Sequence, residues 1–322
     1  MDLFRLVTNT IVASAQYLLG YTFDKNALLL NVYQVNPLMK KLHRPTSSYE
    51  GFTSFIIPST STCTKVLHDQ KHIRDGIKSL QNMLSYINWF HAIPHTIAMS
   101  NELGHYFSSQ TIERELENHK SYHTLFEFDS IIIPKVISER SDSFEMTKLS
   151  PSNCLTTDSR TICAGQLVFA LVKGLKSGII HGDLHPDNIF YYDDTIGIID
   201  FGLMVKLDAS QSGCIISMLH DLTLKKYAEA SYHIMIMIPE IYTISDLDMN
   251  DISQFCIFIL KRAIFINGTF TLHDILEFDK KVHTYGLCLP PIMYRLGYAL
   301  QSMNPVIKDL DIHLDDFIKH LS

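Results

Sequence analysis

A short run of polar residues near the middle of the chain constrains its fold more than any other feature. The run reads H-G-D-L-H-P-D-N-I-F-Y-Y-D-D-T-I-G-I-I-D-F-G-L and has Asp183 as its third residue. Asp183 and Asn188 form a D-x-x-x-x-N pattern, and Asp200 begins a D-F-G. Between them, residues 189–192 and 197–199 predict two short apolar strands joined by the turn D-D-T. Such a hairpin would carry Asn188 at its entrance and Asp200 at its exit, with both facing one cleft.

These residue types and spacings predict phosphoryl transfer from a magnesium-bound nucleotide. In the protein-kinase pattern the first aspartate, here Asp183, orients the attacking hydroxyl or accepts its proton. The asparagine and the D-F-G aspartate, here Asn188 and Asp200, hold the metal ions that bridge the phosphates. Oxygen donors suit this role because Mg²⁺ is a hard cation that takes few protein ligands beside phosphate and water. His181 is expected to pack beneath the D-F-G segment and to bond the backbone.

The same run resembles the UbiB family of atypical kinases, the ubiquinone-biosynthesis kinase-like proteins. H-G-D-L-H-P-D-N followed by I-I-D-F-G-L is similar to the family's H-x-D-x-H-P-G-N and D-F-G-[LM]. The second histidine, His185, separates the run from ordinary protein kinases, which carry lysine there, and Asp187 departs from the family's usual glycine. The run also resembles aminoglycoside and choline phosphotransferases, so by itself it does not choose between these families.

Two upstream segments resemble the nucleotide-handling residues of the UbiB family. T-K-V-L-H at 64–68 is similar to the strand-borne V-K-V-L-H, which implies that Lys65 contacts the α- and β-phosphates of a nucleotide. The helix predicted over 111–122 resembles the E-a-x-N segment, which places Glu115 at the glutamate that pairs with the lysine and Asn118 at the asparagine. The structural alternatives, an exposed strand lysine and a solvated charged helix, stay open at this point.

Other features of the family are absent or altered. The N-terminal residues contain no Lys-x-Gly-Gln motif, and Ser109-Gln110-Thr111 stands where the family has E-x-D. The nucleotide-covering loop expected at 45–57 has a single glycine and no alanine-rich run. In the family the lysine of the first motif contacts the E-x-D glutamate, so the two losses are consistent with each other. They leave open a pseudokinase-like module that binds nucleotide without turning it over.

Composition places the chain among globular proteins and excludes some functions. A hydrophobic content of 46% and a charged content of 19% over 322 residues describe a chain with a sizeable core. The net charge of −7, from 27 basic and 34 acidic residues, argues against a nucleic-acid partner, which would favour a basic excess. The six cysteines form no C-x-x-C pair, which disfavours zinc and redox motifs and favours a reducing compartment.

The sequence shows no stretch of about 20 uncharged apolar residues, so no membrane span is expected. The first 21 residues are amphipathic and contain one arginine, unlike a signal h-region or a transit peptide. A helix packed on the lobe is expected there, with a membrane-surface helix as the alternative. The resemblance implies association with a mitochondrial or other organelle membrane; a cytoplasmic location is the alternative.

The patterns together predict an α+β, two-lobed protein-kinase-like fold. The expected parts are an N-terminal helical extension (1–45), a small sheet-containing N-lobe (46–149) and a helical C-lobe (150–322). In the N-lobe a strand is expected at 130–137, with a proline, Pro134, that suits an edge or a bulge, and a hinge strand at 144–149. A long helix is predicted from a cap at Thr157-Asp158 to Lys176. Further helices are expected at 72–83, 214–222, 227–237, 252–265, 273–282, 291–300 and 314–321.

The resemblance implies a UbiB-like atypical kinase or ATPase that uses Mg-ATP or Mg-ADP and supports ubiquinone or other prenyl-lipid metabolism. Its partners would be a nucleotide and a small-molecule or lipid-like substrate, with peripheral membrane contact. No A-P-E signature follows Leu203, so a protein substrate is not expected. A small-molecule phosphotransferase of aminoglycoside or choline type is the alternative. Leu203 disfavours it, because aminoglycoside phosphotransferases usually carry an acidic residue there.

Overall fold

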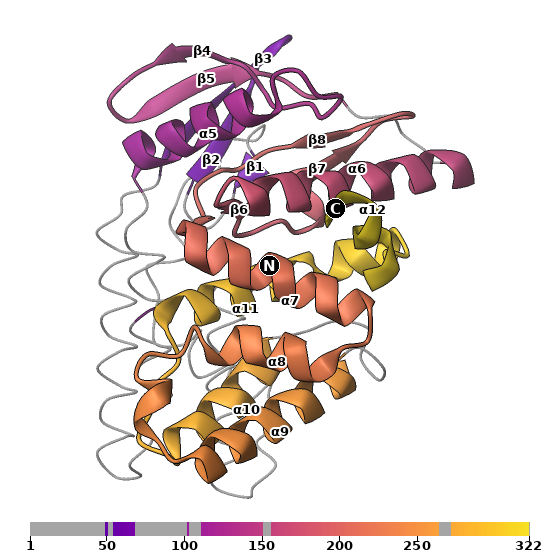
Figure 1. Ribbon diagram of the computed structural model, residues 1–322. Coiled ribbons are helices and arrows are strands. Elements are labelled where there is room, and N and C mark those ends of the chain that lie inside the picture. The colour runs from indigo at the N-terminus through magenta and orange to yellow at the C-terminus, as the bar shows by residue number, and fades with distance from the viewer. Residues whose placement is uncertain are drawn as a thin grey trace, which may run out of the picture.

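The chain forms a small lobe built on a sheet and a larger, mostly helical lobe (Figure 1). The computed structural model describes residues 49–50, 54–67, 102, 111–150, 156–263 and 272–321. Within these residues the α+β, two-lobed architecture predicted from the sequence is confirmed. The predicted N-terminal extension, the helix at 72–83, and Ser109-Gln110 lie outside the described part of the chain.

The N-lobe is a five-stranded antiparallel sheet in the order β1-β2-β3-β5-β4. Its strands are β1 (Tyr49–Glu50), β2 (Ser54–Pro58), β3 (Thr62–Leu67), β4 (Val136–Glu139) and β5 (Ser143–Thr147). The central strand β3 pairs Lys65 with Ile56 on one side and with Phe144 on the other. β1 and the start of β2 lie in the segment expected to cover a nucleotide, and residues 51–53 between them are not among the described residues.

The helix α5 (Ile112–Phe126) packs its buried side against the sheet. Thr111 begins this helix by accepting a hydrogen bond from the backbone N–H of Arg114. Side chains alternate between the two faces of a strand, so Cys63 and Lys65 are buried while Thr64 is partly exposed. The lysine therefore lies on the face of β3 that the apolar pattern buries, among residues that pack with α5.

The C-lobe begins with the long helix α6 (Thr157–Lys176), as predicted. Thr156 caps its start, and Gly178, with a φ of 73°, turns the chain out of the helix. Two antiparallel strand pairs follow: β6 (Ile179–His181) with β9 (Met204–Lys206), and β7 (Ile189–Tyr191) with β8 (Ile196–Ile198). A short 3-10 turn, η2 (Pro186–Asn188), precedes β7. The second pair is the predicted hairpin.

Helices make up the rest of the described C-lobe, and most are longer than predicted. They are α7 (Ala209–Thr223), α8 (Tyr227–Met235), α9 (Asp246–Arg262), α10 (Leu272–His283), α11 (Pro291–Asp309) and α12 (Ile318–Leu321), with the 3-10 turns η3 (Ile241–Thr243) and η5 (Leu314–Phe317). The largest difference is in α11, which was expected to end at Leu300 but continues through Pro305. None of the helices in the described part of the chain is long and apolar enough to cross a membrane.

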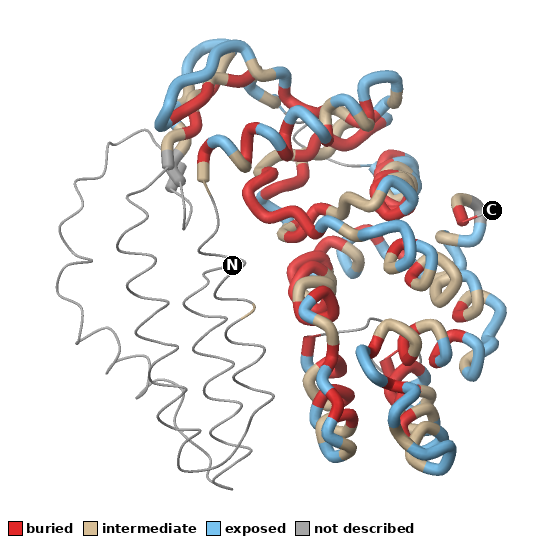
Figure 2. The backbone as a smooth tube through the Cα atoms, turned by 60° about the vertical axis from the view of Figure 1, so that its left-hand side comes forward, coloured by how far each residue is buried: buried red, intermediate tan, exposed pale blue. Residues whose placement is uncertain are grey.

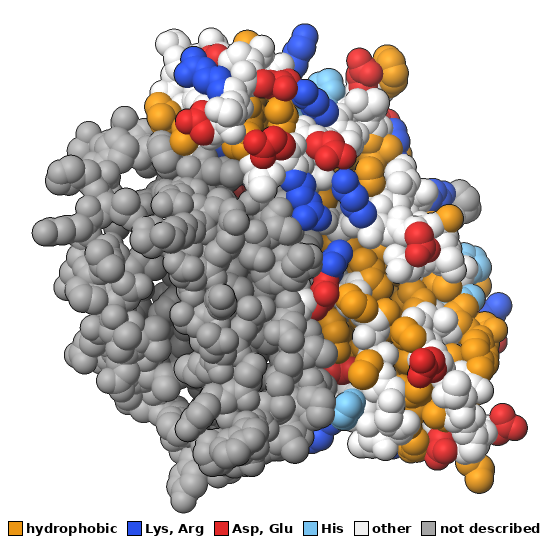
Figure 3. Space-filling model, turned by 90° about the vertical axis from the view of Figure 1, so that its left-hand side faces the viewer, with side chains coloured by type: hydrophobic (Ala, Val, Ile, Leu, Met, Phe, Trp, Pro, Cys, Tyr) orange, Lys and Arg blue, Asp and Glu red, His pale blue; other side chains and the backbone are white. Residues whose placement is uncertain are grey.

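The C-lobe has two apolar clusters, and α11 contributes to both. Its Tyr298 packs in the cluster formed mainly by α8, α9 and α10, whereas its Met303 and Val306 pack in the cluster around α6 and the two strand pairs. Figure 2 shows the buried residues along the sides of the helices that face each other. On the face shown in Figure 3, charges of both signs are interspersed on the N-lobe, and apolar side chains gather over the helical lobe.

The strand expected at 130–137 forms only in part. β4 begins at Val136, and Ile132 makes a single parallel bridge to Gly197 of the hairpin. Pro134 lies between them, and its missing N–H prevents continuous pairing. Its carbonyl oxygen instead accepts a hydrogen bond from His119 Nε2 at 2.6 Å. The apolar residues of this segment fit a strand, but Pro134 has no N–H to donate to a neighbouring strand.

Candidate active site

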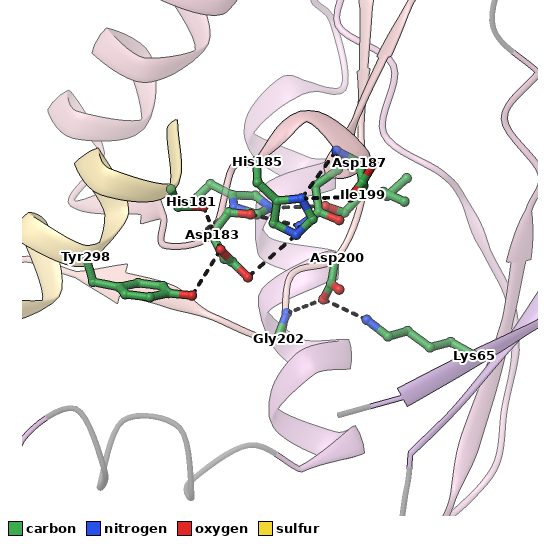
Figure 4. A network of polar contacts seen from close by, with 11 residues as sticks. Lys65, His181, Asp183, His185, Asp187, Ile199, Asp200, Gly202 and Tyr298 are labelled. Atoms are coloured by element: carbon green, nitrogen blue, oxygen red, sulfur yellow. Dashed lines mark hydrogen bonds and ion pairs between the residues drawn. The ribbon is translucent and has the colours of Figure 1, made fainter. Parts of the chain in front are cut away.

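A buried lysine lies between two carboxylates where the lobes meet. Lys65 Nζ is 2.5 Å from Glu115 Oε1 and 2.7 Å from Asp200 Oδ1. Lys65 and Glu115 are 2% and 4% exposed, while the Asp200 side chain is 38% exposed. Figure 4 shows the lysine pointing from β3 toward Asp200. Lys65 and Glu115 are thus buried inside the protein, and Asp200 is the member of the group that solvent can reach.

Burial and mutual charge interactions shift the pKa values of Lys65, Glu115 and Asp200. Burial raises the pKa of Glu115 to about 7, against the opposing effect of the Lys65 ammonium. Although burial would lower it, the pKa of Lys65 lies above its ordinary value because Asp200 and Glu115 stabilise the ammonium. Burial also opposes ionisation of Asp200, but Lys65 holds the pKa of that carboxyl below its usual range. Lys65 and Asp200 are therefore charged at neutral pH.

Asp200 adopts a backbone conformation that non-glycine residues rarely occupy. Its φ is 64°, in the left-handed region. Such a conformation persists only where its surroundings enforce it, and it is concentrated at functional sites. Here Oδ1 accepts hydrogen bonds from Lys65 and from the Gly202 N–H, the latter at 3.4 Å. Both contacts within the described residues go to Oδ1, which leaves Oδ2 for another ligand.

Helix α5 holds the D-F-G segment through the residue after Asp200. Asn118 Nδ2 donates to the Phe201 carbonyl oxygen at 3.0 Å. The Phe201 ring is fully buried, and its centroid is 4.7 Å from that of His119 and 5.1 Å from that of Tyr122. Glu115 lies on the same buried side of the helix. One helix therefore positions both the partner of Lys65 and the segment that carries Asp200.

His181 packs beneath the same segment, as expected. The Asp183 backbone N–H donates to His181 Nδ1 at 3.2 Å, so Nδ1 is unprotonated. The proton is then on Nε2, which donates to the Ile199 carbonyl oxygen at 3.1 Å. Burial lowers the pKa of His181, in keeping with this neutral form. His181 therefore ties Asp183 to the end of the hairpin without offering a metal ligand.

Asn188 and Asp183 are joined directly. Asn188 Nδ2 donates to the Asp183 backbone oxygen at 2.8 Å and lies 3.2 Å from His185 Nε2. These contacts use the amide nitrogen, so the amide oxygen is left for another partner. The Ile199 N–H donates to the Asn188 carbonyl oxygen at 3.1 Å, which brings the residue before Asp200 against Asn188. The hairpin closes as its sequence predicted.

The Asp183 carboxylate is held by residues that the sequence analysis did not identify. Its Oδ1 accepts hydrogen bonds from Ser302 Oγ at 2.6 Å and from the Tyr298 hydroxyl at 3.3 Å. Its Oδ2 lies 3.8 Å from His185 Nε2. Figure 4 shows the carboxylate between Tyr298 on one side and His185 on the other. Ser302 and Tyr298 lie in α11 in no recognisable motif, so no sequence signal pointed to them.

The donors that remain fit a magnesium ion. They are the second carboxylate oxygen of Asp200 and the amide oxygen of Asn188, both hard oxygen ligands. Among the described residues no group of three or more His, Cys, Asp or Glu side chains could hold a metal ion. A site with few protein ligands suits a cation that binds mainly through phosphate and water.

The fold and these contacts are those of a protein-kinase-like site. A sheet lysine is paired with a helix glutamate, and the asparagine and the D-F-G aspartate lie at the two ends of one hairpin. The model of the ABC1 atypical kinase-like domain matches residues 65–233, more than half of the 322-residue chain. The chain belongs to this family of atypical kinase-like proteins, which confirms the resemblance drawn from its motifs.

The solved structures that match the chain share little sequence with it. The complex of Rv3197 with erythromycin from Mycobacterium tuberculosis is 13% identical, with a TM-score of 0.46 over 97% of this chain and 88% of that one. ADP-bound aminoglycoside phosphotransferase APH(2'')-Ib is 10% identical, with a TM-score of 0.30 over 82% and 98%. A choline/ethanolamine kinase family protein from Mesorhizobium loti is 8% identical, with a TM-score of 0.31 over 90% and 99%. The search of curated proteins found no match.

Proposed function

We propose that the protein is an atypical kinase or ATPase that uses Mg-ATP. The observation that carries the proposal is the Lys65 ammonium, which lies within 2.7 Å of both the Glu115 and the Asp200 carboxylates. A surface lysine or a solvated charged helix would not require this burial. Removing the Lys65 ammonium from water is costly unless neighbouring carboxylates stabilise it. Membership of the ABC1 atypical kinase-like family supports the same reading.

Each residue has a distinct role in the proposal. Lys65 binds the α- and β-phosphates, and Glu115 holds the lysine in place. The oxygens of Asn188 and Asp200 hold Mg²⁺, which when bound neutralises charge on the phosphates. Asp183 orients the hydroxyl of an acceptor, or a water molecule, and takes its proton. Its carboxylate is 26% exposed, so it is open to such a group.

The acceptor and the setting follow from the family resemblance. We assign a small-molecule or lipid-like acceptor, and a role in ubiquinone or other prenyl-lipid metabolism at an organelle membrane. The described C-lobe passes from β9 directly into α7, which is consistent with the absence of a peptide-docking segment. The missing Lys-x-Gly-Gln and E-x-D motifs favour one competing function, a module that binds nucleotide without turnover.

Nucleotide binding is tested by thermal unfolding with Mg-ATP and Mg-ADP. A ligand at a hundred times its Kd stabilises the folded state by about 2.7 kcal/mol, so the Tm should rise. Asp200→Asn should remove the rise because it takes away a metal ligand. Asp194→Asn is the matched control, since Asp194 is exposed in the turn of the same hairpin. Absence of any shift in the wild-type protein would contradict the proposal.

Turnover is tested by ATP consumption and its dependence on Asp183. ATP hydrolysis or phosphoryl transfer that Asp183→Asn abolishes would support the kinase or ATPase. Nucleotide binding without turnover under any condition would support the binding module instead. Turnover that requires an aminoalcohol or an aminoglycoside would identify a small-molecule phosphotransferase.

A further inference from the structure

The C-terminal helix α11 provides two hydroxyl groups to Asp183. Ser302 Oγ donates to Asp183 Oδ1 at 2.6 Å, and the Tyr298 hydroxyl donates to the same oxygen at 3.3 Å. The two residues are one helical turn apart, so their side chains share a face of α11. Each is 5% exposed. Both lie beyond residues 65–233, the part of the chain that the family model matches.

The position of α11 is fixed by packing on both sides of these hydroxyls. Tyr298 lies in one apolar cluster of the C-lobe, and Met303 in the other. Gly297 lets α10 approach closely, because a Cβ there would be 3.0 Å from Leu272 Cδ1 and 3.1 Å from Ile275 Cγ1. Closely packed elements do not shift without loss of contacts. The hydroxyls therefore approach Asp183 from a rigid support.

The two oxygens of the Asp183 carboxylate differ as a result. Oδ1 is occupied by both hydroxyl donors, whereas Oδ2 lies 3.8 Å from His185 Nε2, beyond hydrogen-bond distance. Rotation of the carboxylate would break the short bond from Ser302. Oδ2 is thus the oxygen available to an acceptor. The hydrogen bonds from α11 to Oδ1 determine the direction in which Oδ2 points.

We propose that Ser302 and Tyr298 are positioning residues that orient the Asp183 carboxylate, so that Oδ2 faces the attacking hydroxyl or water. This rests on the proposed function, because it assigns the orientation of the group that takes the acceptor's proton. Misplacing a reacting group by about 1 Å can cost roughly a hundredfold in rate. Loss of the two hydroxyls should therefore slow turnover while leaving nucleotide binding, which depends on Lys65 and Asp200, unchanged.

The test compares single variants in steady-state ATP turnover. Ser302→Ala should lower kcat by roughly tenfold and leave the KM for ATP within twofold, since the oriented group is lost but the phosphate contacts remain. Tyr298→Phe removes the longer bond and should lower kcat less. Ser302→Thr retains a hydroxyl at the same Cβ and should restore most of the rate if its methyl group is accommodated.

The matched control is Ser231→Ala. Ser231 is 0% exposed, and its hydroxyl bonds the Ala228 carbonyl oxygen at 2.9 Å and Ser253 Oγ at 3.0 Å, within α8 and α9. Ser231→Ala also removes a buried hydroxyl and its hydrogen bonds. These bonds are not connected to Asp183, so kcat should not change. Melting curves of all variants verify that each is folded at the assay temperature.

Two results would overturn the inference. One is a wild-type kcat in both Ser302→Ala and Tyr298→Phe; the other is an equal loss of kcat in Ser231→Ala, which would mean that general destabilisation is responsible. If the wild-type protein itself failed to turn over ATP, the proposed function and the positioning role would fall together. Wild-type turnover that is insensitive to Ser302 would overturn the positioning role alone.

Discussion

The Lys65 ammonium lies 2.7 Å from the Asp200 carboxylate, although 135 positions separate the two residues in the chain. Lys65 is on a sheet strand and Asp200 follows a hairpin of the helical lobe. Their contact joins the two lobes at the site where the proposed function places a nucleotide phosphate.

Removing Lys65 should destabilise the protein far more than removing an exposed lysine. Lys65→Met leaves Glu115 buried beside no cation, which typically costs about 3–5 kcal/mol. Adding Glu115→Leu should recover much of this loss, because an apolar pair replaces the broken ion pair. Lys120→Met is the control: its ion pair with Glu139 is exposed, and such pairs contribute about 0–1 kcal/mol. Urea unfolding measures all three, and equal losses for Lys65 and Lys120 would refute the prediction.

Stability should fall in weak acid because of His119. Burial lowers the pKa of His119 to about 4, although its Nε2–H donates to the Pro134 carbonyl oxygen. The unfolded chain binds a proton near pH 6.5, so this stabilisation is complete above that pH and is lost as the pH falls toward 4. Between pH 7 and pH 5 the loss should be about 2 kcal/mol.

His119→Gln provides the comparison for this pH dependence. Glutamine can donate to the same carbonyl but does not titrate, so its urea midpoint should change less between pH 7 and pH 5 than that of the wild-type protein. All other titratable groups are the same in both proteins, so their contributions cancel in the difference. Parallel pH profiles would show that His119 does not contribute.

Two glycines of α6 should respond to alanine with opposite signs. A Cβ at Gly174 would lie 2.5 Å from the backbone oxygen of Ile179, so Gly174→Ala should destabilise by about 1–3 kcal/mol. Gly165 is exposed in the same helix with nothing within 4 Å of an added Cβ. Gly165→Ala should therefore stabilise by roughly 0.5–1 kcal/mol through helix propensity. Thermal melting of both variants measures the two changes. A change in Tm of the same sign in both would contradict the packing.

Removal of divalent cations should abolish the stabilisation by nucleotide. In the proposed function the oxygens of Asn188 and Asp200 would contact phosphate only through a cation, because both are acceptors that carry no proton and the carboxylate also repels phosphate. Excess EDTA should thus reduce the Tm shift produced by ATP to about zero, and added Mg²⁺ should restore it. The melting temperature without nucleotide should not change. A full ATP shift in EDTA would argue against a metal at these residues.

Much of the fold followed from local patterns. The hairpin around Asn188 and the long helix α6 were predicted from apolar runs, a turn and a cap. The helix that carries Glu115 was predicted from its charge pattern, and the strand that carries Lys65 from the family resemblance. The errors lay at the bounds of elements. The expected strand at 130–137 is interrupted at Pro134, and the helix expected to end at Leu300 continues to Asp309.

By itself, the sequence determined the order and type of the groups at the site: a lysine, a glutamate, two aspartates and an asparagine, each on a recognisable local element. The family resemblance implied that Lys65 pairs with Glu115. Only the tertiary structure decided that Lys65 also binds Asp200, and that Ser302 and Tyr298 bond Asp183. The reason is physical. Spacing along the chain records which side chains share a strand or a helix face, whereas contacts between distant segments depend on how whole elements pack.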